Sequence, residues 1–186
     1  TYRAMKQNGI SVSLDGHGAD ELYAGYHHQT AKAAKLVDNP QLAALYKQTL
    51  NEMTVDGRDS YAGLPGLDRA SFLNASPNFP LIENQQADAV RIKEFDPITQ
   101  QLYLDFHYQT LPVILRNFDR SSMANGVEIR APFMDWRLVC QAFTIPIEYK
   151  IANGYSKYIL REALGGLLPS SVRSRKSKLG FITPIQ

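Results

Sequence analysis

The segment between residues 10 and 26 constrains the fold more than any other part of the sequence. Ile10–Leu14 alternates apolar and polar residues and therefore predicts a β-strand. Asp15-Gly16-His17-Gly18 follows as a tight loop, and Ala19–Tyr26 is expected to continue as a helix. A strand, a glycine loop and a helix in this order form a fragment of an α/β unit, with the loop at the carboxyl end of the strand.

Since a single strand cannot form a sheet, we expect the neighbouring strands to lie upstream, outside this sequence. The first residues favour the same interpretation. Thr1–Asn8 is typical of the end of a helix already under way, and Asn8-Gly9 is a helix stop. The sequence does not begin with Met. We therefore expect residues 1–186 to be a single partial domain cut from a longer protein.

Helical spacing dominates the remaining residues. We expect helices over Gln41–Val55, from Asp96-Pro97 onward, from Pro112 to Met123, over Asp135–Phe143, over Tyr155–Leu164 and, briefly, after Pro169. Residues Asp56–Asn84 show no sustained period, and we expect them to be mobile. The predicted fold class is mainly α, with one N-terminal strand that belongs to a parallel sheet.

Composition and charge exclude several classes of protein. The 186 residues are 44% hydrophobic and 20% charged, which is too apolar for a disordered chain. No apolar run approaches the roughly 18 residues of a membrane helix, and Thr1–Lys6 does not resemble the start of a signal peptide, so we expect no membrane partner. A net charge of +2 argues against nucleic-acid binding. Cys140 is the only cysteine, which excludes disulfides within the chain and favours a reducing, cytoplasmic location.

The glycine loop is the first candidate for chemistry. Two Gly residues flanking a polar residue let backbone N–H groups approach a ligand, and the following helix N-terminus favours an anion. Asp20 and Glu21 add the hard oxygen ligands that Mg²⁺ prefers beside phosphates. The same residues also fit a plain strand-to-helix turn in which two acids complement the helix dipole.

Residues 119–135 form the second constellation. A helix is expected to end near Gly126, and an extended stretch should run to Pro132. Glu128 and Arg130 fall on one side of that stretch, where we expect a structural ion pair in a buried connection. Arg120 follows an apolar helix, so it can either extend along the surface or act as a phosphate clamp.

Lys157 is expected in the first turn of a helix, where the helix dipole disfavours a cation. Its placement suggests a function, although an ordinary surface lysine also fits. Four cations then lie close together in residues 173–178. We interpret this basic tail as facing phosphate or solvent rather than nucleic acid, because the rest of the chain does not continue the basic patch.

Together these segments resemble the synthetase domain of glutamine-dependent asparagine synthetases. The family motif S-G-E-G-A-D-E-L-F-G-G-Y is similar to D-G-H-G-A-D-E-L-Y-A-G-Y at residues 15–26. The motif D-R-x-S-M-A-x-x-x-E-x-R-x-P-F-x-D fits residues 119–135 at every fixed position. K-Y-x-L-R-E-A matches residues 157–163, and a close similar to R-x-K-x-G-F-x-x-P lies within residues 175–184. The motifs follow the family order, and the resemblance is weakly supported only over residues 37–94.

The resemblance implies a fold and a reaction. This chain is similar to the helical C-terminal half of an α/β nucleotide-binding synthetase domain of the PP-loop, adenine nucleotide α hydrolase-like type. MgATP adenylates the side-chain carboxylate of aspartate and releases pyrophosphate. Ammonia, which a separate N-terminal glutaminase domain obtains from glutamine, then displaces AMP to give asparagine. The implied substrates are therefore aspartate, ATP and ammonia, and the implied cofactors are ATP and Mg²⁺.

The same resemblance assigns residues to roles. Asp15 and Gly16 match nucleotide contacts, Asp20 matches the acid near Mg²⁺ and pyrophosphate, Arg120 faces the phosphates, and Lys157 matches the essential lysine beside the reacting phosphate. Glu128 and Arg130 are structural. The partners would be the glutaminase domain and the PP-loop half of the same protein, and we also expect a homo-oligomer.

Two positions depart from the family motif. His17 stands where the family has glutamate, and Asp15 stands where it has serine. An imidazole cannot supply the charge of a carboxylate, so His17 becomes a candidate catalytic residue and the acceptor stays open. Relatives of this fold also close β-lactam rings and amidate peptides or surface sugars, and an inactive helical interaction module is a further alternative. The S-G-G-x-D-S loop of the family is absent, so we expect this chain alone to be inactive.

Overall fold

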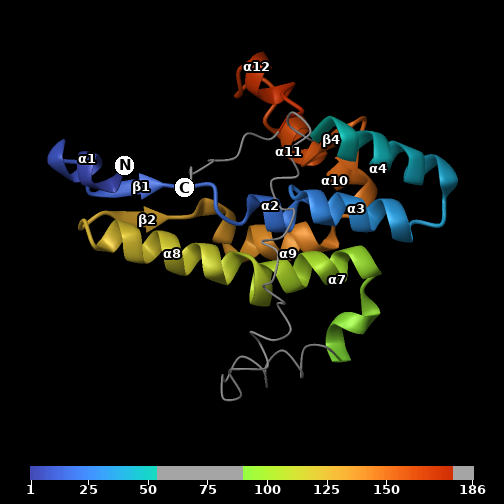
Figure 1. Ribbon diagram of the computed structural model, residues 1–186, viewed down its shortest axis with the longest axis horizontal. Coiled ribbons are helices and arrows are strands. Elements are labelled where there is room, and N and C mark those ends of the chain that lie inside the picture. Colours follow the sequence, from blue (N-terminus) through green and yellow to red (C-terminus); the bar gives the residue numbers. More distant parts are fainter. Residues whose placement is uncertain (54–89, 178–186) are drawn as a thin grey trace, which may run out of the picture.

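The computed structural model describes residues 1–53 and 90–177 and is mostly helical (Figure 1). Before the gap lie α1 (Tyr2–Gln7), β1 (Val12–Leu14), α2 (Ala19–Leu22), α3 (His27–Leu36) and α4 (Pro40–Met53). After it come the 3₁₀ helix η1 (Ile92–Glu94), α7 (Pro97–Leu104), the π-helix η2 (Asp105–Gln109), α8 (Leu111–Met123), β2 (Glu128–Arg130) and the 3₁₀ helix η3 (Pro132–Met134). The last elements are α9 (Trp136–Thr144), α10 (Ile147–Lys150), β3 (Ile151–Ala152), β4 (Tyr155–Ser156), α11 (Tyr158–Ala163) and α12 (Ser170–Arg173).

The strand predicted over residues 10–14 forms, but its neighbour comes from this chain. β1 pairs in parallel with β2, and Val12 lies opposite Glu128. The backbone N–H of Asp15 extends the pairing by donating to the carbonyl of Arg130 at 2.9 Å. The expectation that all sheet neighbours lie upstream was therefore wrong for one side of β1. The extended stretch predicted before Pro132 supplies that partner, because its alternating side chains suit a pleated strand.

The predicted ion pair on β2 is present but lies in a different environment. Nε of Arg130 donates to Oε1 of Glu128 at 2.9 Å, and both side chains are more than half exposed. The expectation of a buried connection was wrong, because the two side chains project from the solvent side of a two-stranded ribbon. Their mutual attraction lowers the pKa of Glu128 and raises the pKa of Arg130, first through the hydrogen bond.

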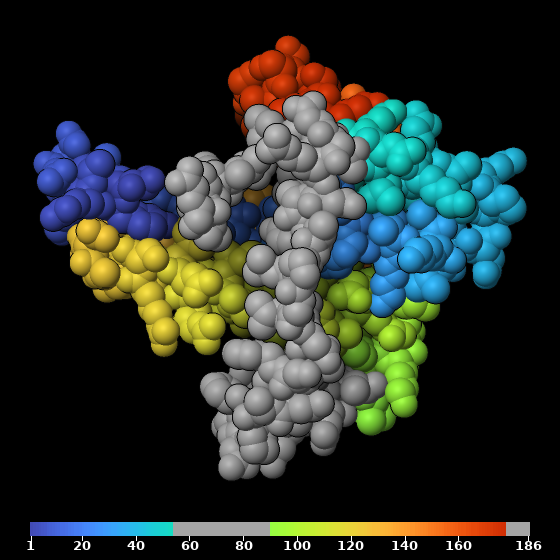
Figure 2. All heavy atoms as spheres, viewed as in Figure 1, coloured from blue at the N-terminus to red at the C-terminus, as the bar shows by residue number. Residues whose placement is uncertain are grey.

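Two apolar clusters hold the helices together. One joins α3, α4 and α7 through Tyr46, Leu102 and Ile151. The other joins α2, α8 and α9 through Leu22 and Leu111, and residues of α11 pack against it. In Figure 1, α3 and α4 lie side by side, and α7 and α8 run along the opposite side of the body. Figure 2 shows α1 and β1 in blue at one end of the molecule and the light-blue and cyan helices α3 and α4 at the other.

Several helix starts were predicted correctly because their capping residues are local signals. Oδ1 of Asp96 accepts hydrogen bonds from the backbone N–H groups of Ile98 and Thr99 at the start of α7. Oδ1 of Asn39 does the same for the first turn of α4. Asp135 caps α9 in the same way. The predicted mobile segment Asp56–Asn84 and the end of the predicted helix Gln41–Val55 lie outside the described residues.

A buried carboxylate connects three of the helices. Oδ2 of Asp105 is 2.7 Å from Nε2 of His28 and 2.8 Å from Nε2 of Gln29, which both lie on α3. Oδ1 accepts from Thr110 at 3.1 Å. Burial acts to raise the pKa of Asp105, but these hydrogen bonds outweigh burial and lower it. Because Asp105 opens the π-helix between α7 and α8, this network fixes α3 against that junction.

A buried lysine, Lys150, carries an electrostatic cost. Lys150 ends α10 with only 1% of its surface exposed, and its Nζ has no hydrogen-bond partner within residues 1–53 and 90–177. Burial lowers the pKa of Lys150 from 10.5 to about 8, and the Asp96 carboxylate offsets only part of the effect. The ring of Phe143 lies 5.8 Å from the ammonium and provides a weak cation–π contact. No helix in residues 1–53 or 90–177 has the length and apolarity to cross a membrane.

We predict that Lys150→Met stabilises this chain at neutral pH. The pKa of Lys150 is lower in the folded state, so the charged side chain destabilises the fold below pH 8, and the penalty disappears as pH rises toward 10.5. A shift of this size corresponds to at most about 3 kcal/mol in the free energy of unfolding. Urea unfolding of wild type and variant between pH 7 and 10 measures the difference.

The difference should shrink steadily over that pH range. Lys47→Met, at an exposed position on α4, is the matched control and should show no such trend. A constant difference between wild type and Lys150→Met would contradict the assignment of a buried lysine whose pKa is lowered by folding.

Candidate functional site

An ion pair joins two motifs that are far apart in the sequence. Nζ of Lys157 donates to Oδ1 of Asp20 at 3.1 Å, although the residues are 137 positions apart. Asp20 lies in the first turn of α2, and Lys157 is the N-cap of α11. Both side chains are partly buried, with 24% of Asp20 and 29% of Lys157 exposed. The structure therefore places these two predicted site residues together.

The backbone after α2 is shaped around the Asp20 carboxylate. The predicted helix Ala19–Tyr26 ends at Leu22, and Ala24 adopts a left-handed φ of 55°. The N–H of Gly25 then donates to the carbonyl of Asp20 at 2.8 Å. A Cβ atom at Gly25 would collide with the Asp20 carboxylate, so only glycine fits there. The helix prediction was too long because this return of the chain, fixed by Gly25, overrides local helix propensity.

Lys157 is held in a strained conformation. A short hairpin precedes it, in which β3 and β4 pair antiparallel across the turn Asn153-Gly154. Both turn residues have positive φ, as the two-residue hairpin turn requires. Lys157 itself has φ 54° and ψ 34°, which costs on the order of 1 kcal/mol for a residue with a side chain. The predicted helix Tyr155–Leu164 therefore starts late, at Tyr158, and Lys157 precedes its first turn.

A cavity of about 260 Å³ lies beside the ion pair. The start of α2, the turn after it and η3 contribute to the lining, together with Lys157 and the basic tail. The lining includes Ala19, Gly25, Phe133, Lys157, Arg161, Arg173, Arg175 and Lys176. The tail predicted to face phosphate or solvent thus reaches the same cavity as Lys157. We call this cavity the cationic pocket.

The cations of the tail differ in their contacts. Nζ of Lys176 lies 2.5 Å from Oε2 of Glu52 on α4 and 4.8 Å from the centre of the Tyr155 ring. Its hydrogen bond with Glu52 lowers the pKa of that carboxyl and raises the pKa of Lys176. Arg175 is exposed, and among the described residues its side chain has no ion pair. Arg175 is therefore available to an anion entering the pocket.

Glu21 does not join Asp20 in the pocket. Its side chain is 1% exposed, and its Oε1 accepts a hydrogen bond from Oη of Tyr26 at 2.7 Å. Burial raises the pKa of Glu21 despite that hydrogen bond. The expectation of a pair of metal-binding acids was wrong, because adjacent residues on a helix point in different directions and Glu21 points inward.

Asp15 and His17 contact each other rather than the cationic pocket. Nε2 of His17 lies 3.5 Å from Oδ2 of Asp15, and Oγ of Ser13 donates to Oδ1 of the same carboxylate. His17 is 15% exposed, and its ring packs edge-on against Phe118 of α8 at 4.6 Å between centroids. The His17 side chain is not part of the pocket lining. Its catalytic role stays a prediction.

Gly16 and Arg120 are both exposed and lie outside the pocket lining. A Cβ atom at Gly16 would meet nothing within 4 Å, so the described residues leave open space around it. The neighbouring Gly18 differs, because its φ of 97° and its contacts with Phe133 and Met134 leave little room for a side chain. The structure thus requires glycine at position 18 and leaves position 16 accessible to a ligand.

The donor set for a metal is limited. Residues 1–53 and 90–177 contain no cluster of three or more His, Cys, Asp or Glu side chains that would bind a metal alone. Asp20 is a partly exposed carboxylate beside the cationic pocket. Mg²⁺ is commonly held by one or two carboxylates plus substrate phosphates, so Asp20 fits a metal that arrives with a phosphate ligand.

Comparison with known proteins identifies the family. The family model "Asparagine synthase" matches residues 1–186. The chain is 30% identical over 95% of its length to the glutamine-hydrolysing asparagine synthetase 1 of Bacillus subtilis, and 29% identical over 94% to asparagine synthetase 3 of that organism. It is 28% identical over 95% to a putative asparagine synthetase of Mycobacterium bovis. No solved structure matches it.

The matches cover 31%, 26% and 30% of these three relatives, so the chain spans less than a third of their length. The four motifs that carry the resemblance all lie within the residues that the family model matches. The chain belongs to the asparagine synthase family.

Proposed function

We propose that this chain is part of an ATP-dependent amidotransferase that makes asparagine in the cytoplasm. The side-chain carboxylate of aspartate attacks the α-phosphorus of ATP, and pyrophosphate leaves. Ammonia, released from glutamine by a separate glutaminase domain, then attacks the activated carbonyl, and AMP leaves with the former carboxylate oxygen. The observation that carries the proposal is the Asp20–Lys157 ion pair at a pocket lined by cations.

Lys157 suits the step in which charge develops on the leaving pyrophosphate. Its ammonium is a compact charge, and its strained backbone aims it at the pocket beside Asp20. A preorganised cation costs no reorganisation when negative charge grows in the transition state. Arg175 and Lys176 add positive charge around the same space. Together these groups can hold a polyphosphate anion.

Asp20 has two tasks in the proposal. It orients the Lys157 ammonium, and it would bind Mg²⁺ that enters with ATP. When bound, Mg²⁺ neutralises phosphate charge. Asp15 and Gly16 would contact the nucleotide, and Arg120 would contact the phosphates. The open space at Gly16 and the exposed Arg120 support these roles, because both positions are accessible from outside this chain.

The proposal includes a PP-loop nucleotide-binding half against β1. Val12 and Leu14 on β1 are exposed, and 74% of Leu14 is accessible. Met123, the last residue of α8, is also exposed. Apolar strands in α/β domains are normally covered on both faces. The exposed apolar face of β1 therefore supports a nucleotide-binding half that packs against it. A homo-oligomer is part of the same proposal.

A second candidate function is an AMP-forming amide ligase with another acceptor. The observation that favours it is the Asp15–His17 contact, because the family carries serine and glutamate at these positions. Compared with the family motif, the carboxylate stands at position 15 instead of position 17. The imidazole of His17, which packs on Phe118, occupies the position of the glutamate. Such a change alters the charge presented to the acceptor while leaving Asp20 and Lys157 in place.

We predict that Lys157→Ala abolishes synthesis in the gene product that contains this chain but leaves glutamine hydrolysis intact. Removing a cation that stabilises transition-state charge should cost on the order of 3 kcal/mol, or a loss of 10²- to 10³-fold in kcat. Pyrophosphate release with aspartate measures the first activity, and glutamate formation measures the second.

Lys157→Arg should fail as well, since a planar guanidinium does not replace a point charge in this geometry. Lys35→Ala, at an exposed position on α3, is the control and should keep full activity. A normal rate of pyrophosphate release in Lys157→Ala would remove Lys157 from the mechanism.

The two candidate functions predict different results for His17→Glu combined with Asp15→Ser. This double variant restores the family motif in the glycine loop. If aspartate is the substrate, pyrophosphate release with aspartate should be kept or rise. If the loop recognises another acceptor, the variant should lose activity with that acceptor and gain it with aspartate. A panel of amino acids, peptides and amino sugars in the same assay distinguishes these results.

A further inference from the structure

We propose that Arg161 is a positioning residue that fixes the positions of both Lys157 and the basic tail of the cationic pocket. The inference rests on the proposed function. Arg161 lies on α11, one turn after Lys157, and is partly buried. Its Nε donates to the carbonyl of Ser156 at 3.0 Å. Its Nη1 donates to the carbonyl of Arg173 at 2.5 Å. One guanidinium therefore holds the residue before Lys157 and the end of α12.

The first of these bonds acts on the strained part of the backbone. Lys157 adopts a left-handed conformation that a residue with a side chain adopts only when its surroundings impose it. The hairpin holds the chain up to Ser156, which is buried. The bond from Arg161 fixes the carbonyl of Ser156 in the peptide group that joins Ser156 to Lys157. Without it, rotation of this peptide group would relieve the strain and move the Lys157 ammonium away from Asp20.

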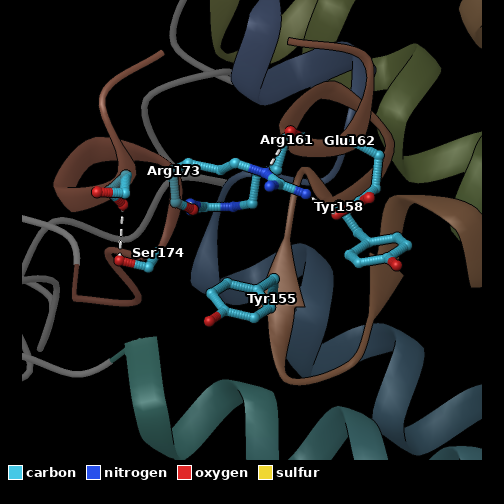
Figure 3. A pocket seen from close by; sticks show the side chains of 7 residues that line it. Tyr155, Tyr158, Arg161, Glu162, Arg173 and Ser174 are labelled. Carbon is cyan, nitrogen blue, oxygen red and sulfur yellow. Dashed lines mark hydrogen bonds and ion pairs between the residues drawn. The ribbon is translucent and has the colours of Figure 1, made fainter. Parts of the chain in front are cut away.

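The second bond belongs to a reciprocal pair, which Figure 3 shows from close by. Nε of Arg173 donates back to the carbonyl of Arg161 at 3.0 Å, and Nη2 of Arg173 lies 2.8 Å from Oε1 of Glu162. These bonds join α12 to α11. Because Arg175 and Lys176 follow directly after α12, the same contacts set where the tail enters the pocket.

The geometry requires arginine rather than lysine. The two carbonyls accept from different nitrogen atoms of one planar group, so a single ammonium on a flexible stem would not reach both in the same arrangement. The guanidinium also lies 5.1 Å from the centre of the Tyr155 ring, which orients it further. Burial lowers the pKa of Arg161, yet arginine stays protonated in proteins and keeps its donors at neutral pH.

Arg161 also lines the cationic pocket, so direct contact with substrate is the competing role. The two roles differ in kinetics. A group that binds the ground state and the transition state of the substrate equally raises KM when it is removed. A group that positions Lys157 lowers kcat, because a shift of about 1 Å in a catalytic group costs roughly 100-fold in rate.

The first test compares Arg161→Met and Arg161→Lys in the gene product that contains this chain. We expect kcat for pyrophosphate release with aspartate to fall about 100-fold in Arg161→Met, with KM for ATP changed less than about threefold. Arg161→Lys should recover less than a tenth of the lost rate. Arg137→Met, on the exposed side of α9, is the matched control and should stay at the wild-type rate. A rise in KM with unchanged kcat would overturn the proposal.

The second test reads the position of Lys157 without any substrate. Trace acetylation with acetic anhydride, followed by mass spectrometry, reports the reactivity of each lysine relative to exposed Lys35 in the same sample. In wild type, Asp20 and partial burial should protect Lys157. In Arg161→Met, its acetylation should rise at least threefold, whereas Arg137→Met should leave it unchanged. Equal protection in all three proteins would contradict the positioning role.

The two tests separate this inference from the proposed function. If wild type releases no pyrophosphate with aspartate, the proposed function fails and the acetylation result still decides the role of Arg161. If Arg161→Met does not fold, Arg161→Lys, which keeps the charge and the length, carries both measurements. Full kcat and full protection of Lys157 in a folded Arg161→Lys would also overturn the requirement for arginine.

Discussion

The candidate site depends on the ion pair between Asp20 and Lys157. Packing of the apolar core brings these two residues together. A partly exposed pair of this kind contributes on the order of 1 kcal/mol or less, which is too little to hold two segments together. Leu22, two residues after Asp20 on α2, is fully buried in the cluster against which Ile159 and Leu160 of α11 pack. Apolar packing therefore brings α2 to α11, and the charged groups meet at the edge of that contact.

Local sequence signals predicted much of this arrangement. Helix caps such as Asp96 and Asp135 act within a few residues, so their positions could be read directly. The loop after β1 also followed from the motifs. The motifs singled out Asp20 and Lys157, and the fold brings these two side chains together. The conformation of Lys157 did not, because the hairpin before it has strands of two residues each, too short for an alternating pattern. The pair Asn153-Gly154, which favours a tight turn, was the signal in the sequence from which the hairpin could have been predicted.

Contacts between distant segments could not be predicted. The pairing of β1 with β2 joins residues more than 100 positions apart, and neither strand indicates its partner. Glu52, in the last turn of α4, holds Lys176 of the tail, yet nothing in its neighbourhood in the sequence distinguishes it from other helical glutamates. The inward orientation of Glu21 depends on Tyr26, which the unexpected end of α2 places within reach. Arg161 stands in a recognised motif, but its two carbonyl acceptors appear only in the fold.

The central claim is that the aspartate carboxylate, and not another acceptor, attacks the α-phosphorus of ATP at this site. Aspartate labelled with ¹⁸O in its side-chain carboxylate tests it most directly, with the gene product that contains this chain, MgATP and glutamine. Attack by the carboxylate transfers one of its oxygen atoms to the phosphate of AMP, so mass spectrometry of the AMP should find one ¹⁸O atom per molecule. Unlabelled AMP formed at the rate of pyrophosphate release would contradict the account.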